Sequence, residues 1–139
     1  MASAIIVGAF FIAGCSEGRP TRVPVAGRVL IDGQPVKSGY IRFMSSGARA
    51  SGSRLSENGE FSLSCFEKND GAVLGTHQIT VNACESIGRD KQKWHAPKKY
   101  GDITTSGLTQ EIKEPVSNLD INLTWDGGQP FIEIVEGAE

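Results

Sequence analysis

Few side chains in this 139-residue chain could carry acid–base or nucleophilic chemistry, because it holds only two histidines, His77 and His95. His77 falls within a run of alternating apolar residues, and that position predicts a buried structural imidazole. His95 lies in a polar stretch, so a Ser–His–Asp arrangement around it would need partners from elsewhere in the chain, and the sequence has no G-x-S-x-G motif. We therefore expect a protein that is not an enzyme, with a hydrolase as the least favoured alternative and no catalytic residue to name.

Residue types that bind metals or phosphates also lack the required spacing. The sequence contains no HExxH, CxxC or Asp-rich calcium loop, and no G-x-G-x-x-G or P-loop pattern. We predict no metal site and no cofactor. Two of the three cysteines, Cys65 and Cys84, lie on strands where alternation gives them opposite faces. If those strands form a hairpin, the two thiols are about 25 Å apart, too far for a disulfide.

The best candidate for contact with a ligand is the segment 89–100, which holds five basic residues together with Trp94 and Tyr100. Aromatic faces stack on sugars, and lysine or arginine side chains hold anionic groups. Alternatively, the segment is a solvated loop whose Trp94 or Tyr100 folds back as a lid over the domain. The candidate contact residues are Lys93, Trp94, His95, Lys98, Lys99 and Tyr100.

The N-terminus carries an apolar run of ten residues, Ala4 to Ala13, that is too short to span a bilayer. It fits the apolar core of a signal peptide, and Ile12-Ala13-Gly14-Cys15 resembles the cleavage motif of bacterial lipoproteins. That resemblance implies a signal peptide over 1–14, a lipid on the Cys15 thiol and a lipidated tether over 15–22. An ordinary buried strand or helix with a chance cysteine is the alternative.

The lipoprotein resemblance also implies where the chain works. We expect a protein of the cell envelope, anchored to the membrane through its lipid on the periplasmic or outer-membrane side. Envelope proteins or glycans are the expected partners. A formal net charge of −2 does not favour a nucleic-acid partner.

Composition and periodicity predict an all-β domain over 23–125. About 125 residues follow the leader, which suits one domain, and 17 glycines separate short apolar runs. Apolar residues recur at every second position, which is typical of half-buried strands, and no helical period appears. We predict about seven strands in an antiparallel β-sandwich. A transthyretin-like or Ig-like type is what the resemblance of the chain's short motifs to a known family implies. The polar segment 85–106 is predicted as a loop, and the tail 126–139 is predicted to add a strand at 131–135. The predicted strands cover 23–31, 40–44, 50–55, 60–65, 76–84, 108–112 and 119–125.

Several short motifs occur in an order that resembles a known family. The chain is similar to carboxypeptidase regulatory-like domains, including those of small planctomycete-type lipoproteins, which share the transthyretin-like (prealbumin-like) sandwich. His77 departs from the pattern, which more often has a tyrosine there. The resemblance implies a structural or binding role and transfers no catalytic residue. The matching stretches are Val25-Ala26-Gly27-Arg28-Val29, Asp32-Gly33-Gln34-Pro35-Val36, Asn58-Gly59-Glu60-Phe61-Ser62-Leu63, Gly75-Thr76-His77-Gln78-Ile79-Thr80-Val81, Pro97-Lys98-Lys99-Tyr100 and Thr105-Ser106-Gly107-Leu108.

The sequence thus predicts a non-catalytic, lipid-anchored β-sandwich module of the cell envelope, with a structural role or a role in contacting proteins or glycans. The alternative is a carbohydrate- or small-ligand-binding module that uses the segment from Trp94 to Tyr100.

Overall fold

The structure is a computed structural model that describes residues 18–135. The predicted signal peptide, Cys15 and the first residues of the tether lie outside the described residues, as does the end of the tail. Within 18–135, no helix has the length and apolarity needed to cross a membrane.

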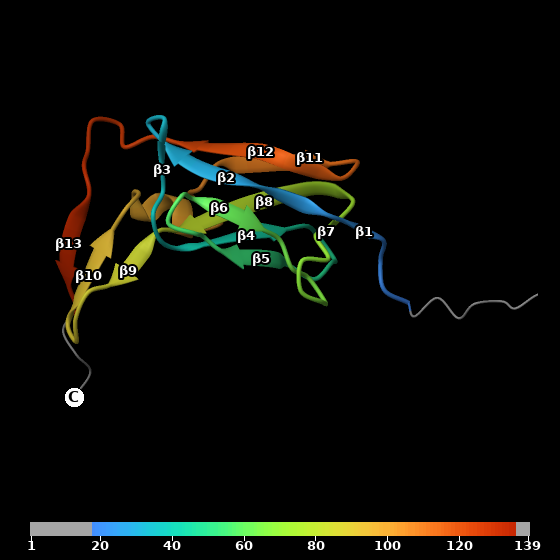
Figure 1. The fold of residues 1–139 in the computed structure, drawn as a ribbon, viewed down its shortest axis with the longest axis horizontal. Coiled ribbons are helices and arrows are strands. Elements are labelled where there is room, and N and C mark those ends of the chain that lie inside the picture. Colours follow the sequence, from blue (N-terminus) through green and yellow to red (C-terminus); the bar gives the residue numbers. More distant parts are fainter. Residues whose placement is uncertain (1–17, 136–139) are drawn as a thin grey trace, which may run out of the picture.

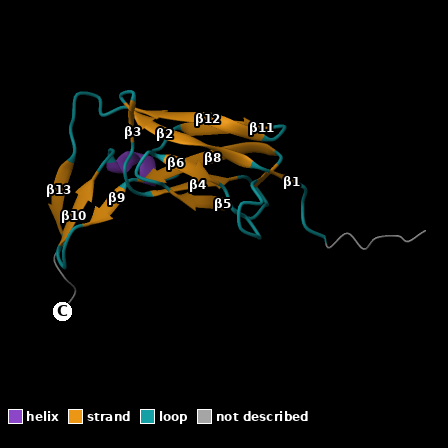
Figure 2. Ribbon diagram, in the orientation of Figure 1, coloured by secondary structure: helices purple, strands orange, loops and turns teal. Residues whose placement is uncertain are grey.

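The described chain is all-β, with one short 3-10 helix, η1 (Figures 1 and 2). The elements are β1 (Arg22–Val23), β2 (Val25–Ile31), β3 (Gln34–Pro35), β4 (Tyr40–Met44), β5 (Ser51–Arg54), β6 (Glu60–Ser62), β7 (Ala72–Val73), β8 (Gly75–Asn82), β9 (Cys84–Ser86), β10 (Lys91–Trp94), η1 (Lys98–Gly101), β11 (Leu108–Ile112), β12 (Val116–Leu123) and β13 (Phe131–Ile134).

Two sheets enclose one apolar core, in the manner of a β-sandwich. One sheet has the order β11-β8-β4-β5, and the other has β12 on one side of β2 and both β3 and β6 on its other side. All pairings in these sheets are antiparallel except that β12 runs parallel to β2, which differs from the all-antiparallel expectation. The reason is topological: the described chain enters β2 from the end of the sandwich that holds the β11–β12 turn, so both strands run away from that end (Figure 1).

The predicted inward faces are confirmed in the longer strands. Val29 in β2, Phe43 in β4 and Ile79 in β8 are completely buried, whereas their neighbours along each strand alternate toward solvent. His77 is also completely buried, as its register predicted, and its Nε2 lies 2.7 Å from the Val73 carbonyl oxygen. Burial of one face on each strand is the main stabilising term in such a sandwich.

Gly27 occupies a half-buried position of β2 where no side chain fits. A β-bulge in β12 between Val116 and Leu119 brings its backbone against β2, and a Cβ on Gly27 would lie 1.9 Å from the Leu119 carbonyl oxygen. A bulge bends a strand and changes where its backbone lies. The absence of a side chain at Gly27 therefore permits the parallel pairing of β12 with β2.

A third, smaller sheet of order β13-β10-β9 stands at one end of the sandwich (Figure 1). It shows that predicting 85–106 as a loop was wrong, because the segment contains most of β9 together with β10 and η1. Its strands are rich in polar residues and only partly buried, so they lack the strong alternation that marks a sandwich strand. The tail supplies β13, which pairs along the whole of β10.

Candidate functional site

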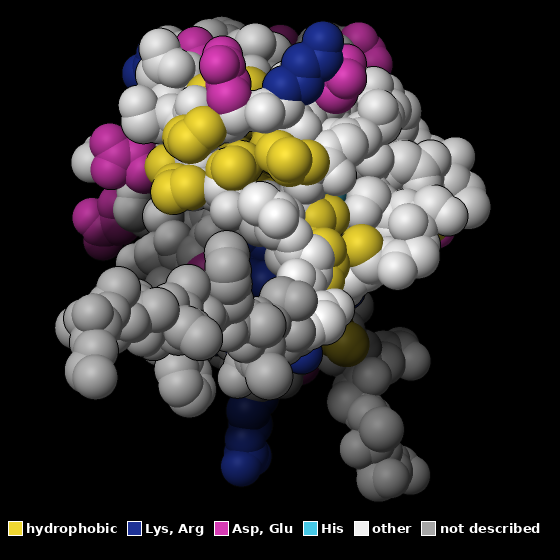
Figure 3. All heavy atoms as spheres, turned by 90° about the vertical axis from the view of Figure 1, so that its right-hand side faces the viewer, with side chains coloured by type: hydrophobic (Ala, Val, Ile, Leu, Met, Phe, Trp, Pro, Cys, Tyr) yellow, Lys and Arg dark blue, Asp and Glu magenta, His cyan; other side chains and the backbone are white. Residues whose placement is uncertain are grey.

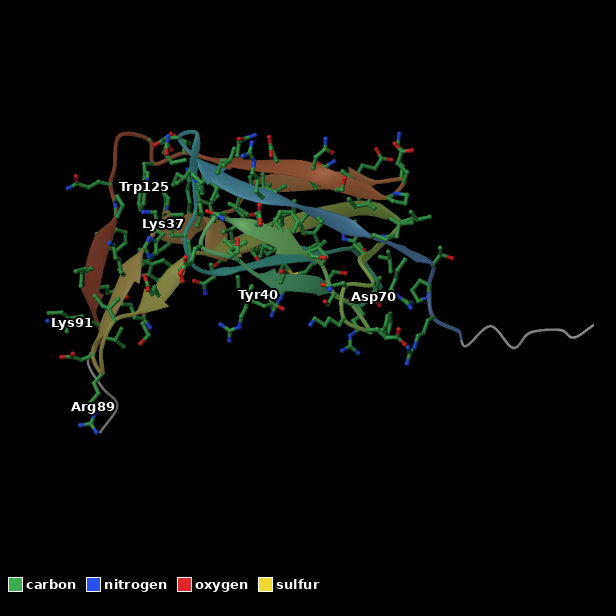
Figure 4. All side chains as sticks on the ribbon, in the orientation of Figure 1. Lys37, Tyr40, Asp70, Arg89, Lys91 and Trp125 are labelled. Atoms are coloured by element: carbon green, nitrogen blue, oxygen red, sulfur yellow. The ribbon has the colours of Figure 1, made fainter. Side chains whose placement is uncertain are left out.

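A cleft of about 330 Å³ lies where the small sheet meets the β2–β3 hairpin. Figure 4 shows Lys37 and Trp125 together at this junction, on the left-hand end of the molecule. The hairpin is shaped by Asp32 and Gly33, which both have positive φ, as their turn-forming sequence predicted. The cleft is lined by Ile31, Asp32, Gln34, Pro35, Lys37, Lys93, His95, Trp125 and Pro130.

Three basic side chains converge on this cleft from two segments of the chain: Lys37, Lys93 and His95. Lys93 and His95 come from β10 and the residue that follows it, two positions apart and therefore on one face of the strand. Lys37 comes from the segment after β3, on the opposite wall. Two lysines beside an indole suit an anionic group attached to a flat, partly apolar body.

His95 is held in place by a carboxylate of the neighbouring strand. Its Nε2 lies 2.7 Å from Oε2 of Glu85 in β9, and its backbone N–H donates to the Ala83 carbonyl. Glu85 stands opposite Lys93 in the β9–β10 register. The carboxylate fixes the orientation of the imidazole at the cleft wall.

Trp94 points to the other side of β10 and packs within the protein. Its ring stacks on Phe131 of β13 with centroids 6.3 Å apart, and the Lys98 ammonium lies 5.3 Å from its centroid. Lys98 also forms an ion pair with Glu133. The indole Nε1 is buried and has no hydrogen-bond partner within the described residues. Trp94 and Lys98 thus fasten the small sheet to η1 and do not line the cleft.

Tyr100 belongs to the core, as the lid alternative proposed. Only 5% of its surface is exposed, and its hydroxyl donates to the Thr124 carbonyl and accepts from the Thr124 N–H, at 3.2 and 3.1 Å. Lys99, beside it, lies 3.1 Å from Asp126, and this hydrogen bond raises the pKa of the Lys99 ammonium. Of the six candidate residues, Lys93 and His95 line the cleft and Trp94 and Tyr100 pack within the protein. Lys98 and Lys99 are exposed and form ion pairs with Glu133 and Asp126.

The cleft also contains residues that sequence reasoning missed. Lys37 follows a turn and Trp125 ends the alternating pattern of β12, so nothing in their local sequence marks a site. They meet β10 only because the small sheet folds against the hairpin. Trp125 is fixed partly by an edge-on contact with Phe131, whose centroid is 6.4 Å away.

The thiols of Cys65 and Cys84 are not part of the cleft lining. Cys65 and Cys84 are both free, Cys65 buried and Cys84 half-buried. Burial raises the pKa of the Cys84 thiol, although the nearby Lys98 partly offsets this. Across residues 18–135, no group of three His, Cys, Asp or Glu side chains is placed to hold a metal ion.

A larger groove of about 580 Å³ lies on the outer face of β12, β2 and β6. Its charged residues are Arg28, Glu60 and Asp120, and the Arg28 Nε lies 3.1 Å from Asp120. Since those two charges satisfy each other and no exposed aromatic ring lines the groove, we favour the cleft as the binding site. No protein-family model, curated protein or solved structure matches the chain, so the site is interpreted from its own geometry.

Proposed function

We propose that the protein is a non-catalytic, lipid-anchored module of the cell envelope, built on a seven-stranded transthyretin-like sandwich, that presents a ligand-binding cleft to its surroundings. One observation carries the proposal: the chain enters the sandwich at one end of the long axis, and the cleft with its small sheet lies at the other (Figure 1). A lipid on Cys15 would therefore place the cleft on the side of the domain that faces away from the membrane.

The chemistry of the cleft favours an acidic saccharide or a similar small anionic ligand. Trp125 offers an apolar ring, and Lys37 and Lys93 offer charged donors on opposite walls. Sugars stack on aromatic rings through their apolar faces, while carboxylate or phosphate groups pair with ammonium groups. The lining also holds one carboxylate, that of Asp32, so its two lysines outnumber its acidic side chains.

The lining of the cleft supports binding without catalysis. His95 and Glu85 form a pair that could act as a base, but no serine, threonine or cysteine is among the residues that line the cleft. A nucleophilic mechanism of the Ser–His–acid type needs a hydroxyl or thiol within hydrogen-bond reach of the imidazole.

Binding to a panel of acidic and neutral glycans tests the ligand proposal. We expect acidic members to bind, and Lys93→Gln or Lys37→Gln to weaken binding about tenfold, because each removes a charge-assisted hydrogen bond. Lys91→Gln is the matched control, since Lys91 lies in the same strand but outside the cleft lining. Binding that Lys93→Gln leaves unchanged but Trp94→Ala abolishes would contradict the cleft and favour the face of β10 that carries Trp94.

The anchor is tested separately with labelled fatty acid in growing cells. We expect the wild-type chain to incorporate label and Cys15→Ser to lose it, because the Cys15 thiol would carry the lipid. Cys84→Ser is the control and should keep its label. Label that persists in Cys15→Ser would refute the lipoprotein interpretation.

A further inference from the structure

The end of the sandwich opposite the cleft carries an unusual cluster of arginines around one aromatic ring. The guanidinium carbons of Arg19, Arg22 and Arg49 lie 4.9, 4.7 and 5.1 Å from the ring centroid of Phe66. Phe66 sits in the loop between β6 and β7 and is half-buried. Stacking on the ring holds three cations near one another, which would otherwise repel.

The loop beneath this cluster is rigidly built around Asp70. Its carboxylate accepts the backbone N–H groups of Cys65, Phe66 and Glu67 at 2.6 to 3.1 Å, and Oδ2 lies 2.7 Å from the Arg22 Nε. Figure 4 shows Asp70 at the right-hand end of the molecule. Asp70 thereby fixes both Phe66 and Arg22, so the arginine cluster has a defined geometry.

Positive charge exceeds negative charge around Phe66, although the chain as a whole has a net charge of −2. Two carboxylates are nearby: Asp70 pairs with Arg22, and Glu67 lies 3.9 Å from Arg19. Within the described residues, Arg49 and Lys68, which follows Phe66 by two positions, are exposed and have no carboxylate partner. Two acidic residues of the same end belong to a separate part of the chain: Glu111 lies in β11, and Glu114 lies in the β11–β12 turn, which also carries Lys113.

An exposed apolar side chain lies beside the arginines. Leu74 forms the corner between β7 and β8 and is 47% exposed, and the preceding Val73 is paired with Arg22 across β7 and β1. Figure 3 looks onto this end and shows hydrophobic side chains gathered there, with both acidic and basic side chains around them. Basic groups around an apolar patch are typical of surfaces that lie on anionic membranes.

The distance to the proposed anchor limits how far this surface can be from a bilayer. Cys15 and Gly18 are three residues apart, and three residues span at most about 11 Å. That length is close to the Debye length of about 8 Å at physiological salt. Salt would therefore only partly screen the electrostatic attraction between Arg19 and the headgroup phosphates. The acidic β11–β12 turn would favour a tilt that brings the Phe66 side closest to the lipid.

We infer that this end is a membrane-docking surface, on which Arg19, Arg22 and Arg49 contact the phosphates of anionic phospholipids and Leu74 enters the headgroup region. The inference rests on the proposed lipid anchor and adds an orientation. The end of the sandwich that carries Phe66 contacts the bilayer, and the end that carries the cleft faces away from it.

The test uses the whole acylated protein, reconstituted in vesicles of phosphatidylcholine with or without phosphatidylglycerol, and a Leu74→Trp reporter quenched by brominated acyl chains. We expect the reporter to add a quenched component that wild-type Trp94 and Trp125, at the far end, do not show. Phosphatidylglycerol should increase this component. Arg19→Gln and Arg49→Gln should each lower the ratio of docked to undocked protein about fivefold, with Arg49→Lys retaining it. Lys91→Gln, at the far end, is the control.

Two results would overturn the inference, and they are distinguishable. Protein that co-sediments with the vesicles while the reporter stays unquenched would refute the docking surface alone. Protein that fails to co-sediment would refute the anchor and the orientation built on it. The melting temperature of Leu74→Trp, measured in parallel, should match wild type because Leu74 is exposed.

Discussion

At the scale of single residues, the local structure depends on the residue type at two positions, Gly27 and Asp70. Gly27 has no side chain because the bulged backbone of β12 occupies that space. Asp70 satisfies three backbone N–H groups and one guanidinium with a single carboxylate. Each makes a specific prediction for stability, because backbone clashes and unsatisfied buried donors are among the costliest local defects.

Gly27→Ala should reduce the free energy of unfolding by about 3 kcal/mol, because its Cβ would displace the backbone of Leu119. Urea unfolding of the purified protein measures this. Gly88→Ala is the matched control, since a Cβ there meets open space and its φ is not positive. Equal stability of the two variants would mean that β12 does not approach β2 as closely as the structure has it.

Asp70→Asn should destabilise the protein by about 2 kcal/mol at neutral pH, because an amide cannot replace the ionised acceptor. Burial raises the pKa of the Asp70 carboxyl, but the backbone donors of Cys65, Phe66 and Glu67 and the Arg22 guanidinium outweigh it and hold the pKa below its ordinary value of 3.8. A carboxyl whose pKa is lowered in the folded protein stabilises the fold at every pH above its pKa in the unfolded chain. That stabilisation is lost as the pH falls through the lower pKa of the folded protein.

The difference between wild type and Asp70→Asn should therefore be constant near neutrality and shrink below a pH of about 4. Unfolding measured across that range checks it, with Asp90→Asn in the exposed β9–β10 turn as the control. A difference that does not depend on pH would show that the Asp70 charge is unimportant to the loop.

At the scale of elements, the strands of the small sheet contain no fully buried residue. Ile132 and Ile134 of β13 are 58% and 66% exposed, and the sheet is held mainly by Trp94, Phe131 and Lys98. Elements with few buried contacts open with the lowest free energy. The wall of the cleft that carries Lys93 is thus the more mobile one, and the hairpin wall is fixed to the sandwich.

Trp94→Ala should speed amide hydrogen exchange in β10 and β13 by about tenfold or more, because it removes the stack on Phe131. Exchange in β2 and β8 should not change. Ile134→Ala, in the same sheet but exposed, should have little effect. Uniformly faster exchange across all strands would instead show that the small sheet and the sandwich unfold together.

At the scale of the whole molecule, Lys37 and Trp125 of the cleft lie at one end of the sandwich, and Asp70, which binds the backbone N–H of Phe66, lies at the other (Figure 4). Substitutions at distant sites with no shared partners are usually additive. We therefore expect Arg49→Gln to leave glycan affinity unchanged and Lys93→Gln to leave lipid quenching unchanged. Both assays on both variants check this, and a cross-effect would mean that the two ends are coupled through the sandwich.

The sequence by itself determined the longer strands of the sandwich and their inward faces. Apolar residues alternate locally along each strand, and the apolar face is the one that is buried. It also placed His77 in the core and the turn at Asp32 and Gly33. Only the tertiary structure decided that β12 runs parallel to β2, that 85–106 holds a small sheet, and that Lys37 and Trp125 join Lys93 and His95 in a cleft. Those features depend on contacts between residues far apart in the chain. The strands of the small sheet are polar, and no local sequence pattern marks Lys37 or Trp125 as part of a site. The chemistry of a site such as this one is therefore set by topology, which brings together residue types that are unremarkable where they stand in the sequence.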